Sequence, residues 1–163
     1  MIRLIVAYDR QRGIAKHGYQ PWSIPDDEAY FAAKTKSAGA EILVGSVTYK
    51  TFDGPLKDRK NYVLTRDKTA IEGVELVHDL EKFLKPYQGT GKDIWVVGGA
   101  NVYGQALDMG LADEIYATAI AADFGCQQFF PEPGPEFQLI SESDLHEQNG
   151  FIYTYQLYAK AAK

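Results

Sequence analysis

The residues best spaced for chemistry lie between Pro21 and Phe31. Pro25 suits the first position of a helix, because its missing N–H would be unpaired there in any case. Three acids then follow at positions 26 to 28. Acids in a first helical turn are commonly solvent-exposed groups that interact with the helix dipole, and this is the plain interpretation of all three.

The spacing of Asp27 favours a second interpretation. Asp27, Phe31 and Thr35 recur every four residues and therefore lie on one helix face, which we expect to face inward. A carboxylate held against apolar groups must be hydrogen-bonded or have a shifted pKa. Trp22 offers an apolar wall and one N–H donor. The sequence therefore predicts an apolar slot with one acid at its floor, suited to a ligand with neighbouring N–H donors.

Composition excludes several classes of protein. The 163 residues suffice for one domain, residues 1–163, with one substantial core. The net charge of −5, with no run of Lys or Arg, argues against nucleic-acid binding. Cys126 is the lone cysteine and the three His residues lack zinc-ligand spacing, so we expect no disulfide, no metal and a cytoplasmic location. The apolar run Ile2 to Tyr8 is too short to span a membrane and is typical of a buried strand.

The elements that must position the slot alternate between strands and helices. We expect strands at residues 2–8, 41–45, 60–65, 74–77, 93–99, 112–122, 137–142 and 151–158, and helices at 25–36, from 46, at 79–84 and at 100–109. This order predicts a single-domain α/β fold with a mostly parallel, eight-stranded twisted sheet, an antiparallel C-terminal strand and about four flanking helices.

Two strands end in glycine and lead into a helix, at Gly45 and at Gly98-Gly99. Free backbone N–H groups at such turns bind anions, so both favour phosphate binding. Neither forms G-x-G-x-x-G, which argues against the dinucleotide-binding fold that carries this motif. Thr65 and Arg66 end the third strand and offer a further phosphate contact, although a solvated charge is the commoner role of one Arg.

The segment Gly13 to Gln20 precedes the slot and has no hydrophobic period. We expect a surface loop, which is either a lid over the slot or a passive connector. A second loop, rich in Gly and Pro, is expected from Phe124 to Pro135, and a third connects the last two strands from Asp144 to Gly150.

Several motifs, in this order, resemble the dihydrofolate reductase family along nearly the whole chain: Ile5-x-Ala7, Pro21-Trp22-x-Ile24-Pro25-x-Asp27-x-x-x-Phe31, Gly45-x-x-Thr48, Gly54-Pro55-Leu56-x-x-Arg59-Lys60-Asn61, Leu64-Thr65-Arg66, Val97-Gly98-Gly99-x-x-x-Tyr103 and Phe129-Phe130-Pro131. The resemblance implies NADPH-dependent reduction of 7,8-dihydrofolate, with hydride transfer from nicotinamide C4 to pterin C6 and protonation of N5 by water. It also implies a monomer that binds antifolate inhibitors and has no nucleic-acid or membrane partner.

The resemblance assigns the substrate site. Asp27 would be the catalytic residue that binds the pterin N3 and 2-amino group, and Thr118 would support it through a hydroxyl. Arg59 would bind the glutamate carboxylate, although a surface charge is the alternative. The remaining substrate contacts would be Ile5, Phe31, Phe52, Leu56, Val97 and Tyr103, with backbone carbonyls contributing at Ile5 and Val97.

The resemblance also assigns the NADPH site. Ala7, Ile14 and Tyr103 would lie near the nicotinamide, and Thr65 with Arg66 would hold the 2′-phosphate. The phosphate and pyrophosphate contacts would come from the two glycine turns, through Gly45, Ser46, Thr48, Gly98, Gly99, Ala100, Asn101 and Val102.

The sequence departs from the family pattern at four places. Glu28 replaces a commonly apolar residue, Ala15 a lid glycine, Ser46 an Arg that helps to bind the 2′-phosphate, and Cys126-Gln127-Gln128 the usual Gly-Asp-Thr. The lost Asp aligns with Gln127 or with Cys126. Because a neutral acceptor binds lid N–H groups more weakly and a Cβ at Ala15 disfavours positive φ, we expect a lid that is more open or differently seated in the cofactor complex.

Two other functions fit parts of the sequence. A reductase acting on a ribosylated aminopyrimidine of riboflavin synthesis shares this fold, but has no need of the Asp27 and Phe31 slot or of Arg59. A non-catalytic nucleotide- or folate-binding module would keep the glycine turns, but an intact Asp27 argues against it.

Overall fold

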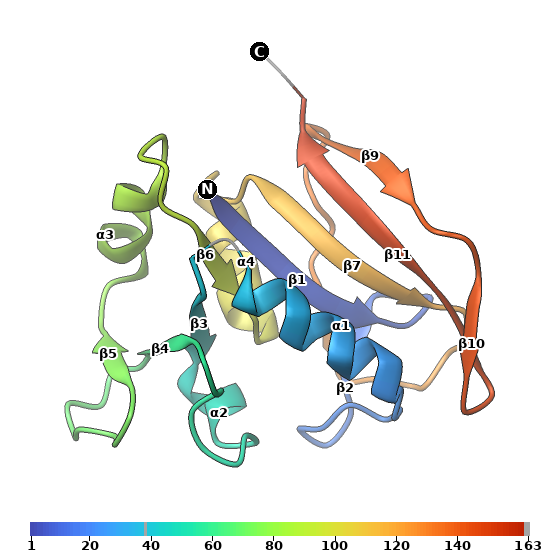
Figure 1. Cartoon of the computed structure of the whole chain (residues 1–163), viewed down its shortest axis with the longest axis horizontal. Coiled ribbons are helices and arrows are strands. Elements are labelled where there is room, and N and C mark those ends of the chain that lie inside the picture. Colours follow the sequence, from blue (N-terminus) through green and yellow to red (C-terminus); the bar gives the residue numbers. More distant parts are fainter. Residues whose placement is uncertain (38, 162–163) are drawn as a thin grey trace.

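The computed structural model describes residues 1–37 and 39–161. One large sheet carries helices on both of its faces (Figure 1). The strands are β1 (Ile2–Tyr8), β2 (Gly13–Ala15), β3 (Glu41–Gly45), β4 (Lys60–Leu64), β5 (Glu75–Val77), β6 (Ile94–Val96), β7 (Glu114–Ile120), β8 (Gln128–Phe129), β9 (Phe137–Glu142), β10 (His146–Gln148) and β11 (Phe151–Lys160). The helices are α1 (Pro25–Lys36), α2 (Ser46–Tyr49), α3 (Leu80–Leu84) and α4 (Ala100–Asp108), with a 3-10 turn at Lys85–Tyr87.

The large sheet has nine strands in the order β10-β11-β7-β1-β6-β3-β4-β5, with β9 also paired to β11. The strands from β7 to β5 are parallel, while β11 runs antiparallel to β7, β9 and β10. The predicted α/β class and the mostly parallel sheet are therefore confirmed. The antiparallel C-terminal end was also expected; it consists of the expected strands β9 and β11 together with the short strand β10, which brings the sheet to nine strands.

Three short strands fall inside segments that we expected to be loops. β2 lies in Gly13 to Gln20, β8 lies in Phe124 to Pro135, and β10 lies in Asp144 to Gly150. β2 and β8 pair with each other in a separate two-stranded sheet. Strands of two or three residues are too short to show a side-chain period, and their partners specify them through backbone hydrogen bonds.

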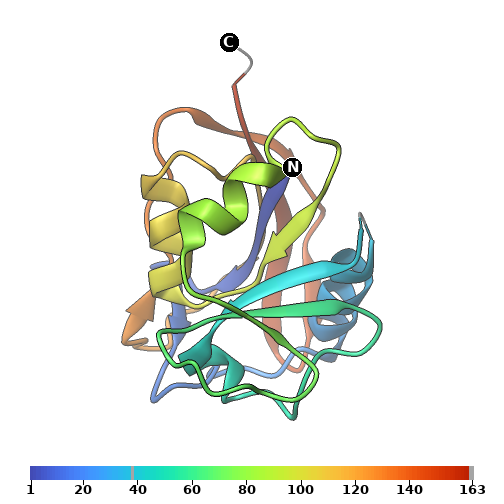
Figure 2. The ribbon, with the colours of Figure 1, turned by 90° about the vertical axis from the view of Figure 1, so that its left-hand side faces the viewer.

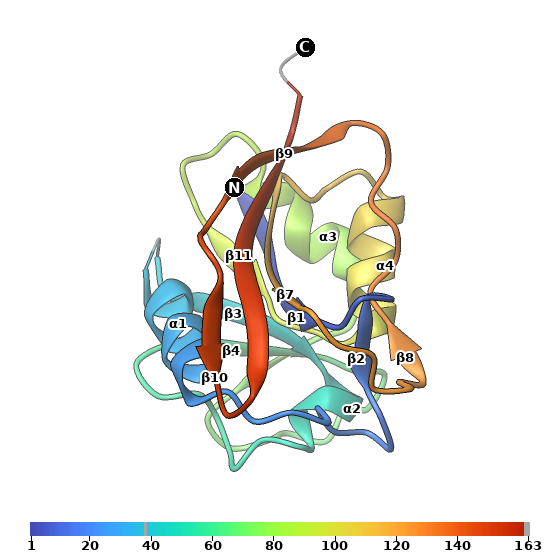
Figure 3. The same ribbon diagram turned by 90° about the vertical axis from the view of Figure 1, so that its right-hand side faces the viewer.

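The helices cover opposite faces of the large sheet. α1 lies against one face, and α3 with α4 lies against the other, as the two side views show (Figures 2 and 3). Apart from Arg3, whose guanidinium pairs with Asp93 and Glu114, β1 is apolar because both of its faces are covered. Leu4 and Val6 pack into the cluster beneath α3 and α4, whereas Ile5 packs into the cluster beneath α1.

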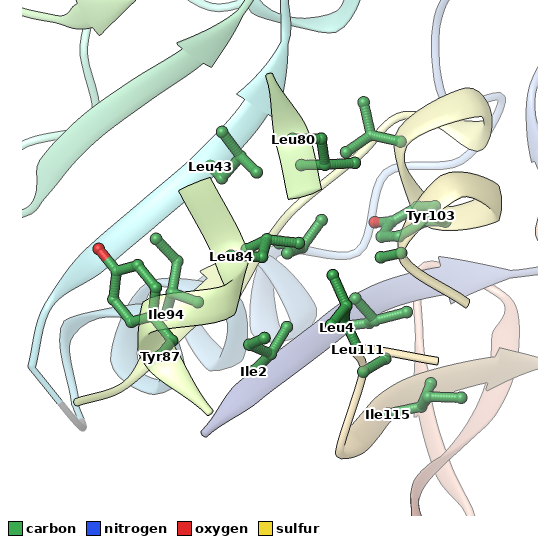
Figure 4. Packing of buried hydrophobic residues seen from close by; sticks show 14 of the residues in the cluster. Ile2, Leu4, Leu43, Leu80, Leu84, Tyr87, Ile94, Tyr103, Leu111 and Ile115 are labelled. Carbon is green, nitrogen blue, oxygen red and sulfur yellow. The ribbon is translucent and has the colours of Figure 1, made fainter. Parts of the chain in front are cut away.

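The larger core lies between α3, α4 and the sheet (Figure 4). Leu84 of α3, Tyr103 of α4 and Leu4 of β1 meet there, and each is fully or almost fully buried. The glycine turn that precedes α4 follows β6, the parallel neighbour of β1, and therefore lies beside the end of β1. The core and this pairing fix the position of the site described next.

Candidate active site

A cavity of about 450 Å³ opens at the carboxyl ends of β1, β6 and β7, the place where ligands commonly bind in open α/β sheets. It brings together many of the predicted site residues: Ile5, Ala7, Ile14, Asp27, Phe31, Thr48, Phe52, Val97, Gly98, Gly99, Tyr103 and Thr118. The segment Gly13–Gln20, the candidate lid and called the lid below, also contributes to the lining through Ile14, Ala15, Gly18, Tyr19 and Gln20. The predicted slot is therefore present.

Asp27 lies in the first turn of α1 and meets β7 across the cavity. The hydroxyl of Thr118, which is only 3% exposed, donates a hydrogen bond to Oδ1 of Asp27 at 2.6 Å. No described residue donates a hydrogen bond to the other oxygen, Oδ2, which leaves it available to a ligand. The Asp27 carboxylate is therefore partly satisfied within the protein.

The pKa of Asp27 is raised above its ordinary value. Burial is the main cause, because it disfavours the charged form, and the nearby charge of Glu28 acts in the same direction. The Thr118 hydrogen bond opposes both by stabilising the carboxylate. The charged form of Asp27 is therefore incompletely stabilised by the protein. A ligand with paired N–H groups would stabilise it further by donating hydrogen bonds.

Apolar and aromatic side chains form the walls of the cavity. Ile5, Phe31 and Phe52 line it, and Trp22 closes one side with its ring packed on Phe124 at a centroid distance of 5.2 Å. The expected wall at Trp22 is present. Its expected N–H donor has no partner among the described residues, and is therefore free for a ligand or water.

Tyr103 lines the cavity from the side of α4. Its buried hydroxyl donates a 2.5 Å hydrogen bond to the backbone carbonyl of Ile5. Burial raises the pKa of Tyr103, so the hydroxyl stays protonated and keeps donating. Since a carbonyl oxygen has two lone pairs, Ile5 can still accept a second bond from a ligand.

The two glycine turns lie side by side because β3 and β6 are neighbouring parallel strands. The N–H of Gly45 donates to the carbonyl of Gly98 at 2.9 Å. A Cβ added to Gly99 would lie 2.6 Å from Oγ1 of Thr48, and one added to Gly45 would lie 2.9 Å from a Val102 methyl. Side chains are therefore excluded from both turns, and the N-terminus of α4 has no side-chain cap. This cradle fits a diphosphate.

Other predicted site residues lie outside the cavity lining: Gly45, Ser46, Leu56, Arg59, Thr65, Arg66, Ala100, Asn101 and Val102. Arg59 is held by Oγ1 of Thr35 and by the carbonyl of Lys57, each at 2.8 Å. Within the described part of the chain it forms no ion pair, and burial lowers its pKa. Arg66 is exposed and has no hydrogen bond or ion pair to any described residue.

The lid is tied to the segment around β8. Oε1 of Gln127 accepts the N–H of His17 at 2.9 Å, and the N–H of Gln127 donates to the carbonyl of Ala15 at 2.9 Å. Of the two alignments left open, Gln127 rather than Cys126 is therefore the side-chain acceptor of a lid N–H. Ala15 lies in extended strand β2, so its Cβ causes no backbone conflict in this conformation.

The sequence reasoning missed several residues of the lining, including Tyr19, Gln20, Tyr30, Thr51 and Gln128. Spacing could have found two of them. Tyr30 lies three residues after Asp27 and Thr51 lies three residues after Thr48, so each pair shares a face of a helical segment. Gln128 carries no such signal, because backbone pairing of β8 with β2 places it.

Neither a metal centre nor a membrane span is found in residues 1–37 and 39–161. These residues contain no group of three or more His, Cys, Asp or Glu side chains able to hold a metal ion. None of their helices has the length and apolar character needed to cross a bilayer.

Comparison with known proteins gives one consistent result. A family model described as dihydrofolate reductase matches residues 1–160. A dihydrofolate reductase of Aedes albopictus is 33% identical over 181 residues, covering 98% of this chain and 97% of the relative. One from Bacillus subtilis (strain 168) is 32% identical over 164 residues, covering 98% and 95%. The solved dihydrofolate reductase from Enterococcus faecalis, complexed with NADP(H) and RAB-propyl, superposes with a TM-score of 0.86 at 26% identity, covering 99% and 97%.

Proposed function

The chain belongs to the dihydrofolate reductase family, and from this premise we propose how its residues carry out the NADPH-dependent reduction of 7,8-dihydrofolate to tetrahydrofolate. The observation that carries the assignment of roles is the carboxylate of Asp27, which has one protein hydrogen bond, to Thr118 at 2.6 Å, inside a cavity with mostly apolar walls. A pterin offers that carboxylate two neighbouring N–H donors, at N3 and at the 2-amino group.

Asp27 acts in catalysis through the negative charge of its carboxylate. Its carboxylate holds the pterin by paired, charge-assisted hydrogen bonds and stabilises positive charge that develops when N5 is protonated. Water delivers that proton. The walls formed by Ile5, Phe31 and Phe52 limit the access of other water, and they strengthen the electrostatic effect of Asp27 by lowering the local dielectric.

The glycine cradle supports the assignment of NADPH. Gly98 and Gly99 leave room for phosphate oxygens next to Thr48, and the uncapped N-terminus of α4 supplies N–H donors. Ala7 and Ile14 would contact the nicotinamide at the inner end of the cavity. The cofactor supplies the hydride when it is bound. The protein contributes orientation, water exclusion and electrostatics.

Arg59 is proposed to bind the carboxylate of the substrate's glutamate arm. It is partly buried, has no carboxylate partner among the described residues, and is oriented by Thr35 and Lys57. A guanidinium held in this way favours a bidentate carboxylate ligand. Leu56 is proposed to pack against the same arm.

The decisive experiment measures the loss of NADPH absorbance when dihydrofolate is added. We expect turnover with dihydrofolate and none with the ribosylated aminopyrimidine of riboflavin synthesis, because a reductase that acts on the aminopyrimidine does not need the slot of Asp27 and Phe31 or Arg59. Oxidation of NADPH by the aminopyrimidine alone would reverse the assignment. Binding of dihydrofolate with no turnover of either compound would indicate a non-catalytic binding module.

A second measurement tests the contacts to the 2′-phosphate. Thr65 and Arg66 end β4, and Arg66 is free of protein partners among the described residues. We expect Arg66→Ala to lower the NADPH to NADH ratio of kcat/KM by about tenfold, the value of one lost charge-assisted bond. Since Ser46 supplies no second guanidinium, the wild-type ratio should itself be modest. An unchanged ratio would remove Arg66 and Thr65 from the cofactor site.

We also propose that the protein acts as a monomeric, single-domain cytoplasmic enzyme and binds antifolate inhibitors. The free thiol of Cys126 fits a reducing compartment. Light scattering tests the oligomeric state, and competition of an antifolate with dihydrofolate tests the shared site.

A further inference from the structure

Asp9 is a buried acid that the reaction does not use. It follows β1 directly in the turn toward β2, its side chain is 3% exposed, and it does not line the active-site cavity. Oδ1 accepts the N–H groups of Gln11 at 2.9 Å and Gly13 at 2.7 Å, and Oδ2 accepts the N–H of Phe124 at 3.2 Å. A buried carboxylate is costly unless it is hydrogen-bonded, and here three backbone donors satisfy it.

The first oxygen of Asp9 stabilises a strained turn. Arg12 has φ +61°, in the left-handed region that side-chain-bearing residues rarely adopt. Its neighbours Gln11 and Gly13 are the two residues whose N–H groups bond to Oδ1, so the carboxylate holds the backbone on both sides of Arg12. Backbone bonds from Asp9 to Gly13 and from Arg12 to Asp9, both 3.0 Å, close the same turn. Strained conformations persist where neighbouring contacts over-determine them.

The second oxygen of Asp9 connects this turn to a distant segment. Phe124, whose N–H it binds, packs its ring against Trp22 at the wall of the active site. The two segments are also close at Gly13, where an added Cβ would lie 2.5 Å from the Cβ of Cys126. One carboxylate therefore fixes both the start of the lid and the support of Trp22.

We propose that Asp9 is a positioning residue that sets where the lid leaves β1 and thereby places Ile14 and Trp22 around the nicotinamide end of the cavity. Ile14 directly follows the turn that Asp9 stabilises, and it lines the cavity. Trp22 packs on Phe124, whose N–H is bonded to Oδ2 of Asp9. The link to the nicotinamide rests on the proposed function. The three hydrogen bonds of Asp9 do not depend on it, because they are part of the fold.

The test compares Asp9→Asn and Asp9→Ala by NADPH binding, followed through quenching of tryptophan fluorescence, and by steady-state kinetics. Both oxygens of Asp9 accept backbone N–H groups, so in Asp9→Asn the amide NH₂ must face a backbone N–H in either orientation. At least one hydrogen bond is then lost, and two donors face each other. We expect NADPH affinity to fall about tenfold in Asp9→Asn and further in Asp9→Ala. KM for dihydrofolate should change less than about threefold, because Asp27 and Thr118 are not displaced.

A rescue variant separates positioning from a general loss of stability. Glycine adopts positive φ without strain, so Arg12→Gly in the Asp9→Ala background should restore part of the NADPH affinity. Amide hydrogen exchange at Gly13 and Phe124 should be faster in both Asp9 variants, and this readout needs no activity. If Asp9→Ala fails to fold, Asp9→Asn and its exchange rates carry the test.

The matched control is Asp123→Asn. Asp123 lies beside Phe124, and its carboxylate makes an exposed 3.7 Å ion pair with Arg10. Removing this charge should leave NADPH affinity unchanged. Three results would each overturn the proposal: unchanged NADPH affinity in Asp9→Asn, a rise in KM for dihydrofolate as large as the loss of NADPH affinity, or no rescue by Arg12→Gly. Absence of dihydrofolate reduction in the wild type, with NADPH quenching retained, would instead overturn the proposed function alone.

Discussion

Asp27 and Asp9 are two acids close to the same cavity, and their surroundings differ. Asp9 is almost fully buried, and three backbone N–H groups satisfy its carboxylate. Asp27 is less buried, yet it receives one hydrogen bond, from the Thr118 hydroxyl, and its pKa is raised. In this pair, the acid that can still bind a ligand is the one with fewer hydrogen bonds from the protein. It is not the more deeply buried one.

The local backbone explains the difference. Asp9 lies in a tight turn, where consecutive N–H groups point toward one side chain, as they do in Asx turns. Asp27 lies in the first turn of α1, and the N–H groups of Asp27 and Glu28 are already bonded to the carbonyl of Ile24. The N–H of Asp26 is bonded to the side chain of Gln148. The Asp27 side chain is therefore left to find its partner across the cavity.

The largest expected effect comes from removing the charge of Asp27. Asp27→Asn should fold and lose about 10² to 10⁴ in kcat/KM near neutral pH, because an amide cannot stabilise the cationic pterin as a carboxylate does. Steady-state kinetics at pH 7 measure this. The activity of the wild type should also fall as the pH rises, since the protonated substrate becomes scarce. Near-wild-type turnover of the variant would remove Asp27 from its role.

The same substitution should stabilise the protein without ligand at neutral pH. Because the folded-state pKa of Asp27 is raised, ionisation disfavours the fold. This penalty is absent well below about pH 4, where Asp27 is protonated in both states, and it grows as the pH rises from the unfolded-state pKa, about 4, to the higher pKa of the folded state. Urea unfolding of Asp27→Asn and wild type should therefore agree at low pH and diverge in favour of the variant at pH 7.

Asp9→Asn provides the opposite result in the same measurement. It replaces a satisfied acceptor by a donor, so the free energy of unfolding at pH 7 should fall by about 1–3 kcal/mol. Opposite signs for the two Asp→Asn changes would confirm the comparison. A change of the same sign in both variants would contradict it.

A smaller effect is expected from Thr118→Val, which keeps the shape of the side chain and removes the hydroxyl. Without that donor the pKa of Asp27 should rise further, because burial and Glu28 are no longer opposed. We expect kcat/KM to fall about tenfold at pH 7, and the acid side of the pH profile to move toward higher pH. Thr118→Ser keeps the hydroxyl and is the control. Identical profiles for the Val and Ser variants would show that the hydrogen bond does not tune Asp27.

The sequence was informative wherever side chains repeat with the period of an element. The four-residue spacing of Asp27, Phe31 and Thr35 predicted an inward face of α1, of which Asp27 and Phe31 line the cavity while Thr35 is buried beside Arg59. The apolar runs predicted the large strands. The two glycine turns were expected separately. Their adjacency depends on the pairing of β3 with β6, which no local pattern encodes.

The parts that the sequence did not predict are specified by the backbone. β2 and β8 pair through main-chain groups, and their few residues carry no period. In the sequence Asp9 is only an acid after a strand, because its importance arises from three N–H groups that the fold brings together from residues 11, 13 and 124. Single polar residues that organise a turn leave no periodic signal.

The smallest expected effect comes from giving the lid a second charged acceptor, in addition to Asp9. Oε1 of Gln127 accepts the N–H of His17 at 2.9 Å, so Gln127→Glu keeps the reach of the side chain and adds a charge. An Asp at this position would be one methylene too short for the same contact.

Charge-assisted hydrogen bonds are roughly twice as strong as neutral ones, so Gln127→Glu should tighten NADPH binding by about threefold to fivefold through a better-held lid. Gln138→Glu makes the same chemical change on exposed strand β9 and should leave the affinity unchanged. Fluorescence titration measures both variants. Equal affinities in the wild type and Gln127→Glu would mean that the tie at His17 does not limit the cofactor-bound lid, and that the backbone bonds between β2 and β8 suffice to hold it.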